Sequence, residues 1–133
     1  MKTLYGILFG FLLLVAMAAT QQQKQSDMAV PAYSTSQEQA FSGTILEVKD
    51  YQCPVTGTIG SHIAVKGTSD TLEVHLAPAK FLKQYDIVLK PGDQVTVTGI
   101  KFTFDGKPAM LARLVVVGRD TFRFRDDKGR PEW

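Results

Sequence analysis

Residues 71–85, TLEVHLAPAKFLKQY, decide the fold, because they join an alternating strand to one short amphipathic segment. Apolar side chains at every second position of 71–76 predict a β-strand with one buried face. Pro78 suits the first turn of a helix, where its missing N–H has no partner to lose. Phe81 and Tyr85 then belong to one apolar helical stripe. A helix this short is not stable alone, so we expect it to cap the open end of a small β-barrel or sheet.

The preceding segment, residues 61–66, alternates in the same way, and a GTSD turn joins the two. Symmetric pairing across this turn sets His62 opposite His75 and Ile63 beside Val74. The apolar side chains of both strands then share one face, so the hydrophobic pattern agrees with the turn. The other predicted pairs are Lys66 with Thr71, Ala64 with Glu73 and Val65 with Leu72.

Further along the chain, Asp105-Gly106 is a strong hairpin signal between two long β-segments. Gly43 and Gly99 each predict a bulge or a bend within a strand. We expect a loop rich in turn formers over residues 49–60. The expected strands cover residues 40–48, 61–66, 71–76, 94–104 and 107–117, and a short final strand covers 121–125.

This order, with one short helix between the third and fourth strands, is typical of the OB-fold. The sequence therefore predicts a mainly β protein with an OB-fold-like five-stranded Greek-key barrel, preceded by an N-terminal signal helix. Another small barrel or a sandwich is the alternative.

The N-terminal segment has the features of an export signal. Its apolar run, residues 4–19, is shorter than the roughly 20 residues that span a bilayer. An AMA motif ending at Ala18 fits cleavage there, and an uncleaved anchor is the alternative. The following glutamine- and serine-rich stretch has little to bury and predicts a disordered spacer. We therefore expect a signal peptide over 1–18, a polar spacer over 19–39 and an OB-fold-like domain over 40–133.

Four sequence blocks resemble those of a group of exported bacterial OB-fold-like proteins of mostly uncharacterised function. The blocks are VHLAPAKFL, LKPGDQVTVTG, GKPAMLAR and FRDDKGRPEW, within residues 41–133. This resemblance implies the fold and export, and similar proteins are sometimes labelled nucleic-acid binding because of their fold. It transfers no active site. Ala77 stands where similar proteins have glycine.

Composition excludes some classes of function. The formal net charge is +2, which indicates no polyanionic partner, although residues 107–133 are a basic end of the chain. The chain has no CxxC, GxxxxGK[ST], HExxH or GxSxG motif, so we expect no enzyme activity. Its single cysteine, Cys53, forms no intrachain disulfide, and an exposed Cys53 would permit a disulfide-linked dimer.

The most specific candidate site is the predicted cross-strand pair of His62 and His75. Directly opposed residues of an antiparallel pair have Cβ atoms about 5 Å apart, close enough for two imidazoles to share a divalent metal ion. Cys53 or Glu73 could complete such a site. The alternative is a pair of solvated histidines on the outside of the barrel, with no cofactor.

Nucleic-acid binding is the second hypothesis. OB-folds hold single strands with aromatic platforms beside basic side chains, and Phe122 and Phe124 alternate with Arg123 and Arg125. The alternative is that both phenylalanines enter the core while both arginines are solvated, as in any half-buried strand.

We therefore expect an exported, periplasmic or secreted binding module without catalytic activity. OB-folds usually recognise ligands on the face of strands two and three, which carries His62, Lys66, Glu73 and His75. The expected partner is an unidentified envelope protein or a small ligand. Contact with a membrane is expected only through an uncleaved signal segment.

Overall fold

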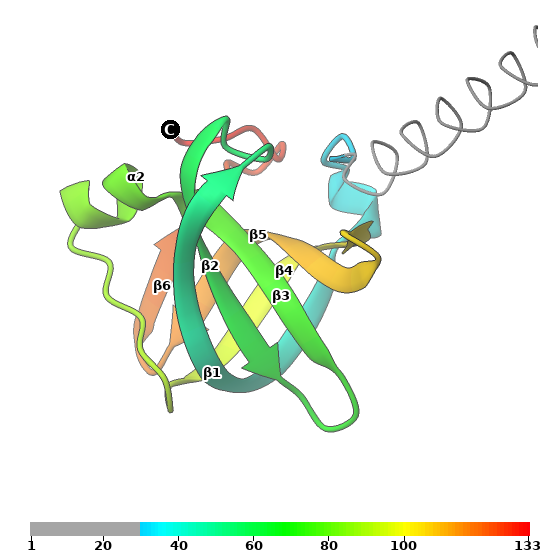
Figure 1. Cartoon of the computed structure of the whole chain (residues 1–133), viewed down its shortest axis with the longest axis vertical. Helices are drawn as coiled ribbons and strands as arrows, with labels where there is room; N and C mark the ends of the chain where they lie inside the picture. The colour runs from blue at the N-terminus through cyan, green and yellow to red at the C-terminus, as the bar shows by residue number, and fades with distance from the viewer. Residues whose placement is uncertain (1–29) are drawn as a thin grey trace, which may run out of the picture.

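The computed structural model describes residues 30–133, and within them the chain is mainly β with one short helix (Figure 1). The expected signal segment and most of the expected spacer lie outside the described residues. None of the helices in residues 30–133 is long and apolar enough to cross a membrane. The elements are η1 (Thr35–Gln37), β1 (Gln39–Cys53), β2 (Thr58–Lys66), β3 (Thr71–Pro78), α2 (Ala79–Gln84), β4 (Gln94–Phe104), β5 (Lys107–Val117) and β6 (Asp120–Arg123).

The strands form one sheet that returns on itself. Its order is β3-β2-β1-β4-β5-β6, with all neighbours antiparallel, and a short parallel pairing between β3 and β5 closes the ring. The sheet has six strands rather than the five of the predicted barrel, because the short final strand expected over residues 121–125 forms as Asp120–Arg123 and pairs with the end of β5. The helix lies between the third and fourth strands, as predicted.

The first strand is shared by both sides of the ring. Its first part pairs with β4 and its second part with β2, and Thr44 pairs with both Lys66 and Gln94. Gly43 lies next to this change of partner, where an added Cβ would collide with the backbone of Lys66. The bulge itself lies two residues later than the sequence suggested, between Ile45 and Glu47.

Both hairpins follow the sequence closely. The pairing of β2 with β3 has the predicted register, including His62 opposite His75. In the β4–β5 hairpin, Asp105 and Gly106 have φ angles of 51° and 72°, as a two-residue type I′ turn requires. The register shifts between Thr98 and Gly99, which confirms the predicted bulge.

The expectation of a loop over residues 49–60 is wrong. Strand β1 continues to Cys53 and β2 starts at Thr58, so only residues 54–57 form the turn. Pairing with β2 extends the strand through Asp50, whose turn-forming tendency is thereby overridden. Cys53 is consequently placed by a strand rather than by a loop.

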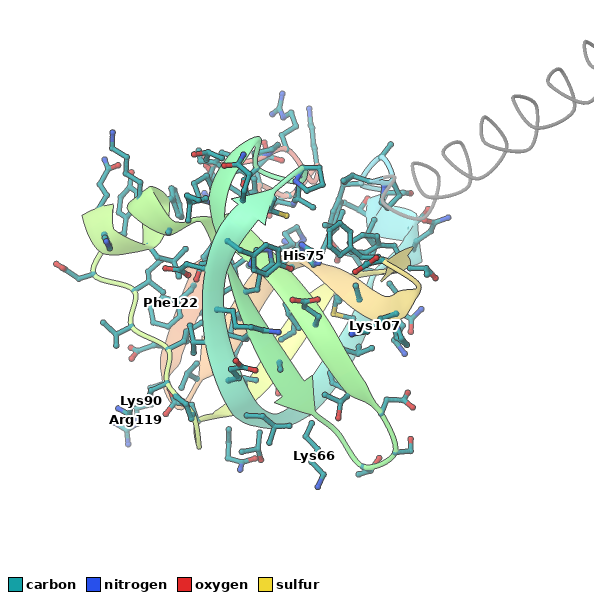
Figure 2. All side chains as sticks on the ribbon, viewed as in Figure 1. Lys66, His75, Lys90, Lys107, Arg119 and Phe122 are labelled. Atoms are coloured by element: carbon teal, nitrogen blue, oxygen red, sulfur yellow. The ribbon has the colours of Figure 1, made fainter. Side chains whose placement is uncertain are left out.

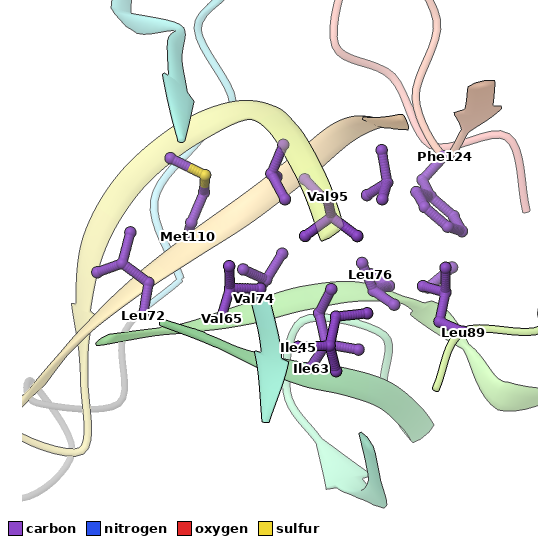
Figure 3. Packing of buried hydrophobic residues seen from close by; sticks show 14 of the residues in the cluster. Ile45, Ile63, Val65, Leu72, Val74, Leu76, Leu89, Val95, Met110 and Phe124 are labelled. Atoms are coloured by element: carbon purple, nitrogen blue, oxygen red, sulfur yellow. The ribbon is translucent and has the colours of Figure 1, made fainter. Parts of the chain in front are cut away.

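The inner face of the ring holds the main hydrophobic core (Figure 3). Side chains of β2 and β3 that alternate inward meet others from β1, β4 and β5, and α2 contributes Leu82 at one end. This placement explains why so short a helix forms, since burial of Leu82 and the packing of Phe81 supply the stability that its length cannot. The core residues are Ile45, Ile63, Val65, Leu72, Val74, Leu76, Ala77, Leu82, Leu89, Val95, Val97, Met110, Ala112, Val115 and Phe124.

Candidate metal centre

Three strands bring one cysteine and two histidines together on the outer face of the ring. His62 on β2 and His75 on β3 are directly paired, and their neighbours Ile63 and Val74 point into the core. Cys53, the last residue of β1, reaches the same place (His75 is labelled in Figure 2). These three residues, called here the Cys–His cluster, are the only cysteine and the only two histidines of the whole chain.

The Cys–His cluster is compact and buried. One potential ligand atom from each residue lies within 4.8 Å of the other two. The Sγ atom of Cys53 is 3.4 Å from Nδ1 of His75, and the two imidazole rings meet edge to face with centroids 4.5 Å apart. Cys53 is 0% exposed, His62 is 1% exposed and His75 is 2% exposed. The expectation of solvated histidines is therefore wrong, and Cys53 lacks the exposure that a disulfide-linked dimer would require.

Hydrogen bonding leaves nitrogen atoms of both rings free to bind a ligand. Nδ1 of His62 lies 3.3 Å from the carbonyl oxygen of Lys49, and because a carbonyl only accepts, this nitrogen carries the proton. Its Nε2 therefore has the lone pair. Nε2 of His75 is buried without any hydrogen-bond partner among the described residues. A buried polar atom left unpaired in this way costs folding free energy, which a bound ligand would recover.

Aromatic rings enclose the cluster. Tyr51 stacks on His62 with ring centroids 3.8 Å apart and nearly parallel planes, and Phe102 and Phe104 contact His75 edgewise. The phenolic O–H of Tyr51 donates to Glu73 at 2.8 Å. These contacts fix the ring orientations before any ligand binds, because neither histidine can turn without displacing a neighbouring ring.

Burial keeps all three residues of the cluster uncharged at neutral pH. It lowers the pKa of His62 and, together with the nearby His62 ring, lowers the pKa of His75 to about 4. It also raises the pKa of the Cys53 thiol. Neutral imidazoles bind metal ions directly, whereas the thiol must first release its proton.

The other residues expected on this face do not join the cluster. The carboxylate of Glu73 is held by Tyr51 and lies 3.8 Å from Nζ of Lys49. Lys66 is exposed at the end of β2, beside the turn to β3. The structure therefore makes Cys53, rather than Glu73, the third candidate ligand. Tyr51 is the functional residue that the sequence did not indicate, because it was assigned to a loop.

At the basic end of the chain, the structure withdraws some of the side chains considered for nucleic-acid binding from the surface and leaves others accessible. Phe124 is fully buried in the core, so it offers no surface on which a base could stack. Arg125 is buried between the rings of Tyr33 and Trp133 and donates to the carbonyl oxygen of Gly129. The expectation that this arginine is solvated is wrong. Arg123 remains half-exposed and pairs with Glu132 at 2.9 Å.

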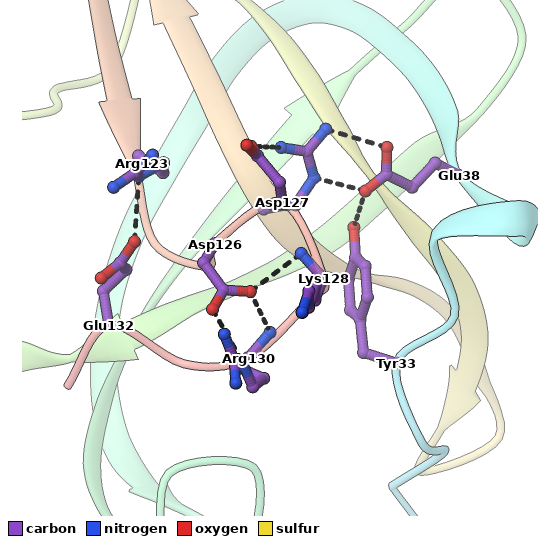
Figure 4. Close-up of polar contacts among 9 residues, drawn as sticks. Tyr33, Glu38, Arg123, Asp126, Asp127, Lys128, Arg130 and Glu132 are labelled. Carbon is purple, nitrogen blue, oxygen red and sulfur yellow. Dashed lines mark hydrogen bonds and ion pairs between the residues drawn. The ribbon is translucent and has the colours of Figure 1, made fainter.

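A second polar group, missed at the sequence level, ties the residues before β1 to the sheet (Figure 4). Arg113 on β5 donates two hydrogen bonds to Glu38, and the O–H of Tyr33 donates a third at 2.8 Å. The Arg113 hydrogen bond is the main reason why the pKa of Glu38 is lowered. Tyr33, Glu38 and Arg113 are called here the Glu38 corner. It extends the ordered fold into the last part of the expected spacer.

Fold and site together define a small, mainly β protein with one buried candidate metal centre. The model of the MamS/MamX magnetosome protein family matches residues 37–122, and the chain belongs to this family. The match includes all three residues of the Cys–His cluster.

The chain is also similar to a named magnetosome protein. It is 34% identical, over 97 residues, to "Magnetosome protein MamS" of Magnetospirillum gryphiswaldense. The similar region covers 70% of this chain and 52% of that protein, so the chain matches only about half the length of this relative.

Proposed function

We propose that this chain is an exported, non-catalytic, magnetosome-associated binding module that holds one metal ion through Cys53, His62 and His75. The convergence of the chain's only cysteine and only histidines at one buried point carries this proposal. Thiolate and imidazole are the side chains that bind transition metals most strongly, and their pairing here involves three different strands.

The scaffold supports such a role. The strand order, the closing β3–β5 pair and the helix between β3 and β4 fit an OB-fold with an added sixth strand. The backbone carbonyl of Lys49 accepts the hydrogen bond from Nδ1 of His62 and so directs Nε2 of this ring towards the cluster, as carbonyl groups behind histidine ligands do at metal sites. Family membership supports the magnetosome association, and the apolar leader supports export.

Metal titration of the full-length chain tests the proposal. The reduced protein would be titrated with Zn²⁺, Co²⁺ and Cu⁺ in turn, and bound metal would be counted by elemental analysis. We expect one equivalent per chain, with a thiolate charge-transfer band in the Co²⁺ complex.

Matched variants give the test its specificity. Cys53→Ser, His62→Gln and His75→Gln should each lose the bound metal, whereas Lys66→Gln and Arg123→Gln should retain it because both residues are exposed and away from the cluster. Circular dichroism would show that each variant is folded. Failure of the folded parent to bind any of the three ions would overturn the proposed function.

A further inference from the structure

We infer that the Cys–His cluster is built for copper(I) in preference to zinc(II) and other divalent ions. This inference rests on the proposed function and names the ion. Four observations carry it: the kind of donor atoms, their number in a closed site, their spacing, and the charge that the site can tolerate.

The donor set is soft. One sulfur and two imidazole nitrogens suit soft and borderline ions, Cu⁺ and Zn²⁺ among them, and disfavour hard ions such as Mg²⁺ and Ca²⁺, so the choice between copper and zinc depends on the number of donors and the charge. Carboxylates would favour harder ions, but Glu73 on the same face is held by Tyr51. No aspartate or glutamate in residues 30–133 belongs to the cluster.

The number of donors is three. Zinc in proteins is almost always four-coordinate, with water or substrate completing an open site. Here the cluster residues are almost fully shielded from solvent, and Tyr51, Phe102 and Phe104 pack around the two rings. A fourth ligand would have to displace these aromatic side chains to reach the metal ion, whereas a three-coordinate Cu⁺ needs no fourth ligand.

The spacing suits a single ion. Two ligands bound to one metal at about 2.3 Å for sulfur and about 2.0 Å for nitrogen lie roughly 3.5 Å apart. The widest separation in the cluster is at most 4.8 Å, so closure by roughly 1 Å completes the site.

The charge balance points to a monovalent ion. Copper(I) bound to one thiolate and two neutral imidazoles gives a site with no net charge. Zinc(II) in the same site would leave one positive charge buried among aromatic rings, and the carboxylate of Glu73 is already paired with Lys49. Burying an unpaired charge is strongly unfavourable.

Competition between the two ions tests this inference on the full-length protein. Cu⁺ affinity would be measured anaerobically against a chromophoric Cu⁺ chelator, and Zn²⁺ affinity against a chromophoric Zn²⁺ chelator. We expect Cu⁺ to bind at least about a thousandfold more tightly. X-ray absorption of the copper complex should show one sulfur and two nitrogen donors.

Substitutions of Cys53 test whether the thiolate causes the preference for Cu⁺. Cys53→Ser should weaken Cu⁺ binding by about a hundredfold or more, and Cys53→His, which offers three imidazoles, should narrow the preference for Cu⁺ over Zn²⁺. Zinc binding as tight as copper binding in the parent would overturn the copper assignment and leave the proposed function standing. Tight Cu⁺ binding that survives in folded Cys53→Ser would also overturn it. Binding of neither ion would overturn both.

Discussion

The Cys–His cluster and the Glu38 corner both shield polar side chains from solvent, but they differ in how these side chains are paired. Only the Glu38 corner pairs every charged side chain with a group of opposite charge. In the Glu38 corner, the carboxylate receives hydrogen bonds from Arg113 and Tyr33. In the Cys–His cluster, all three groups are uncharged and one ring nitrogen has no partner among the described residues. Satisfied polar groups need nothing more to be stable, whereas unsatisfied ones at short range are what a binding site requires.

The largest expected effect is the response of the metal-free protein to acid. The pKa of His75 is lowered from 6.5 to about 4 in the folded state, so the unfolded chain takes up this proton at a higher pH than the folded chain does. Stability from this residue is therefore complete above pH 6.5 and is lost as the pH falls towards 4. The loss should reach roughly 2 to 3 kcal/mol of unfolding free energy.

Urea unfolding at a series of pH values measures this loss. A His75→Leu variant removes this titrating ring and should reduce the slope between pH 6.5 and 4, with His62 causing part of the slope that remains, while Arg123→Gln should keep the parent's slope. An unchanged slope in folded His75→Leu would mean that other groups cause the acid response.

The next largest effect concerns the Glu38 corner. Replacing Glu38 by Gln removes the charge that Arg113 faces, and both side chains are only about one-sixth exposed (16% and 15%). We expect a loss of about 2 kcal/mol in unfolding free energy, less than for a fully buried pair because solvent reaches part of both groups. A double-mutant cycle with Arg113→Met isolates the coupling between them. Metal affinity should be unchanged, and a large change would show that the two regions are not independent.

The smallest expected effect concerns Tyr51, an aromatic neighbour of the Cys–His cluster that we do not expect to bind the metal. Tyr51→Phe keeps the ring stacked on His62 and removes only the hydrogen bond to Glu73. The expected cost is about 1 kcal/mol of unfolding free energy. Metal affinity measured by chelator competition should stay within a few-fold of the parent. Loss of the metal in this variant would make the phenol oxygen a fourth ligand and contradict the three-coordinate site.

Local patterns in the sequence predicted the hairpins but not the contacts that cross the ring. The His62–His75 pairing followed from alternation and turn length, and the β4–β5 hairpin had its predicted bounds. Cys53 was assigned to a loop because Asp50, Pro54 and Gly57 are turn-forming residues, although Tyr51 and Cys53 continue the outward alternation of β1. Pairing with β2 places Cys53 in a strand, and this pairing is a tertiary effect that the local sequence does not show.

The sequence did not predict the Glu38 corner either, because its contacts join residues that are far apart in the chain. Glu38 and Arg113 are 75 residues apart, and nothing near either residue indicates the other. The same holds for Arg125, whose alternation with Phe124 predicted a solvated side chain. The chain bridges Arg125 to Pro131, and the loop between them folds back, so that this guanidinium is covered by Tyr33 and Trp133.

The shared strand β1 couples the two sides of the ring. One continuous backbone carries the pairing with β4 at one end and with β2 at the other. At the bulge between them, the N–H and C=O groups of Ile45 bond to Asp93 and Gly92 in the segment before β4, which fastens the point where the strand changes partner. Neither side of the ring can then open without disturbing the other, so the described domain has one cooperative unit of opening rather than two. An ion held at Cys53, the far end of this strand, would therefore slow the opening of the whole ring.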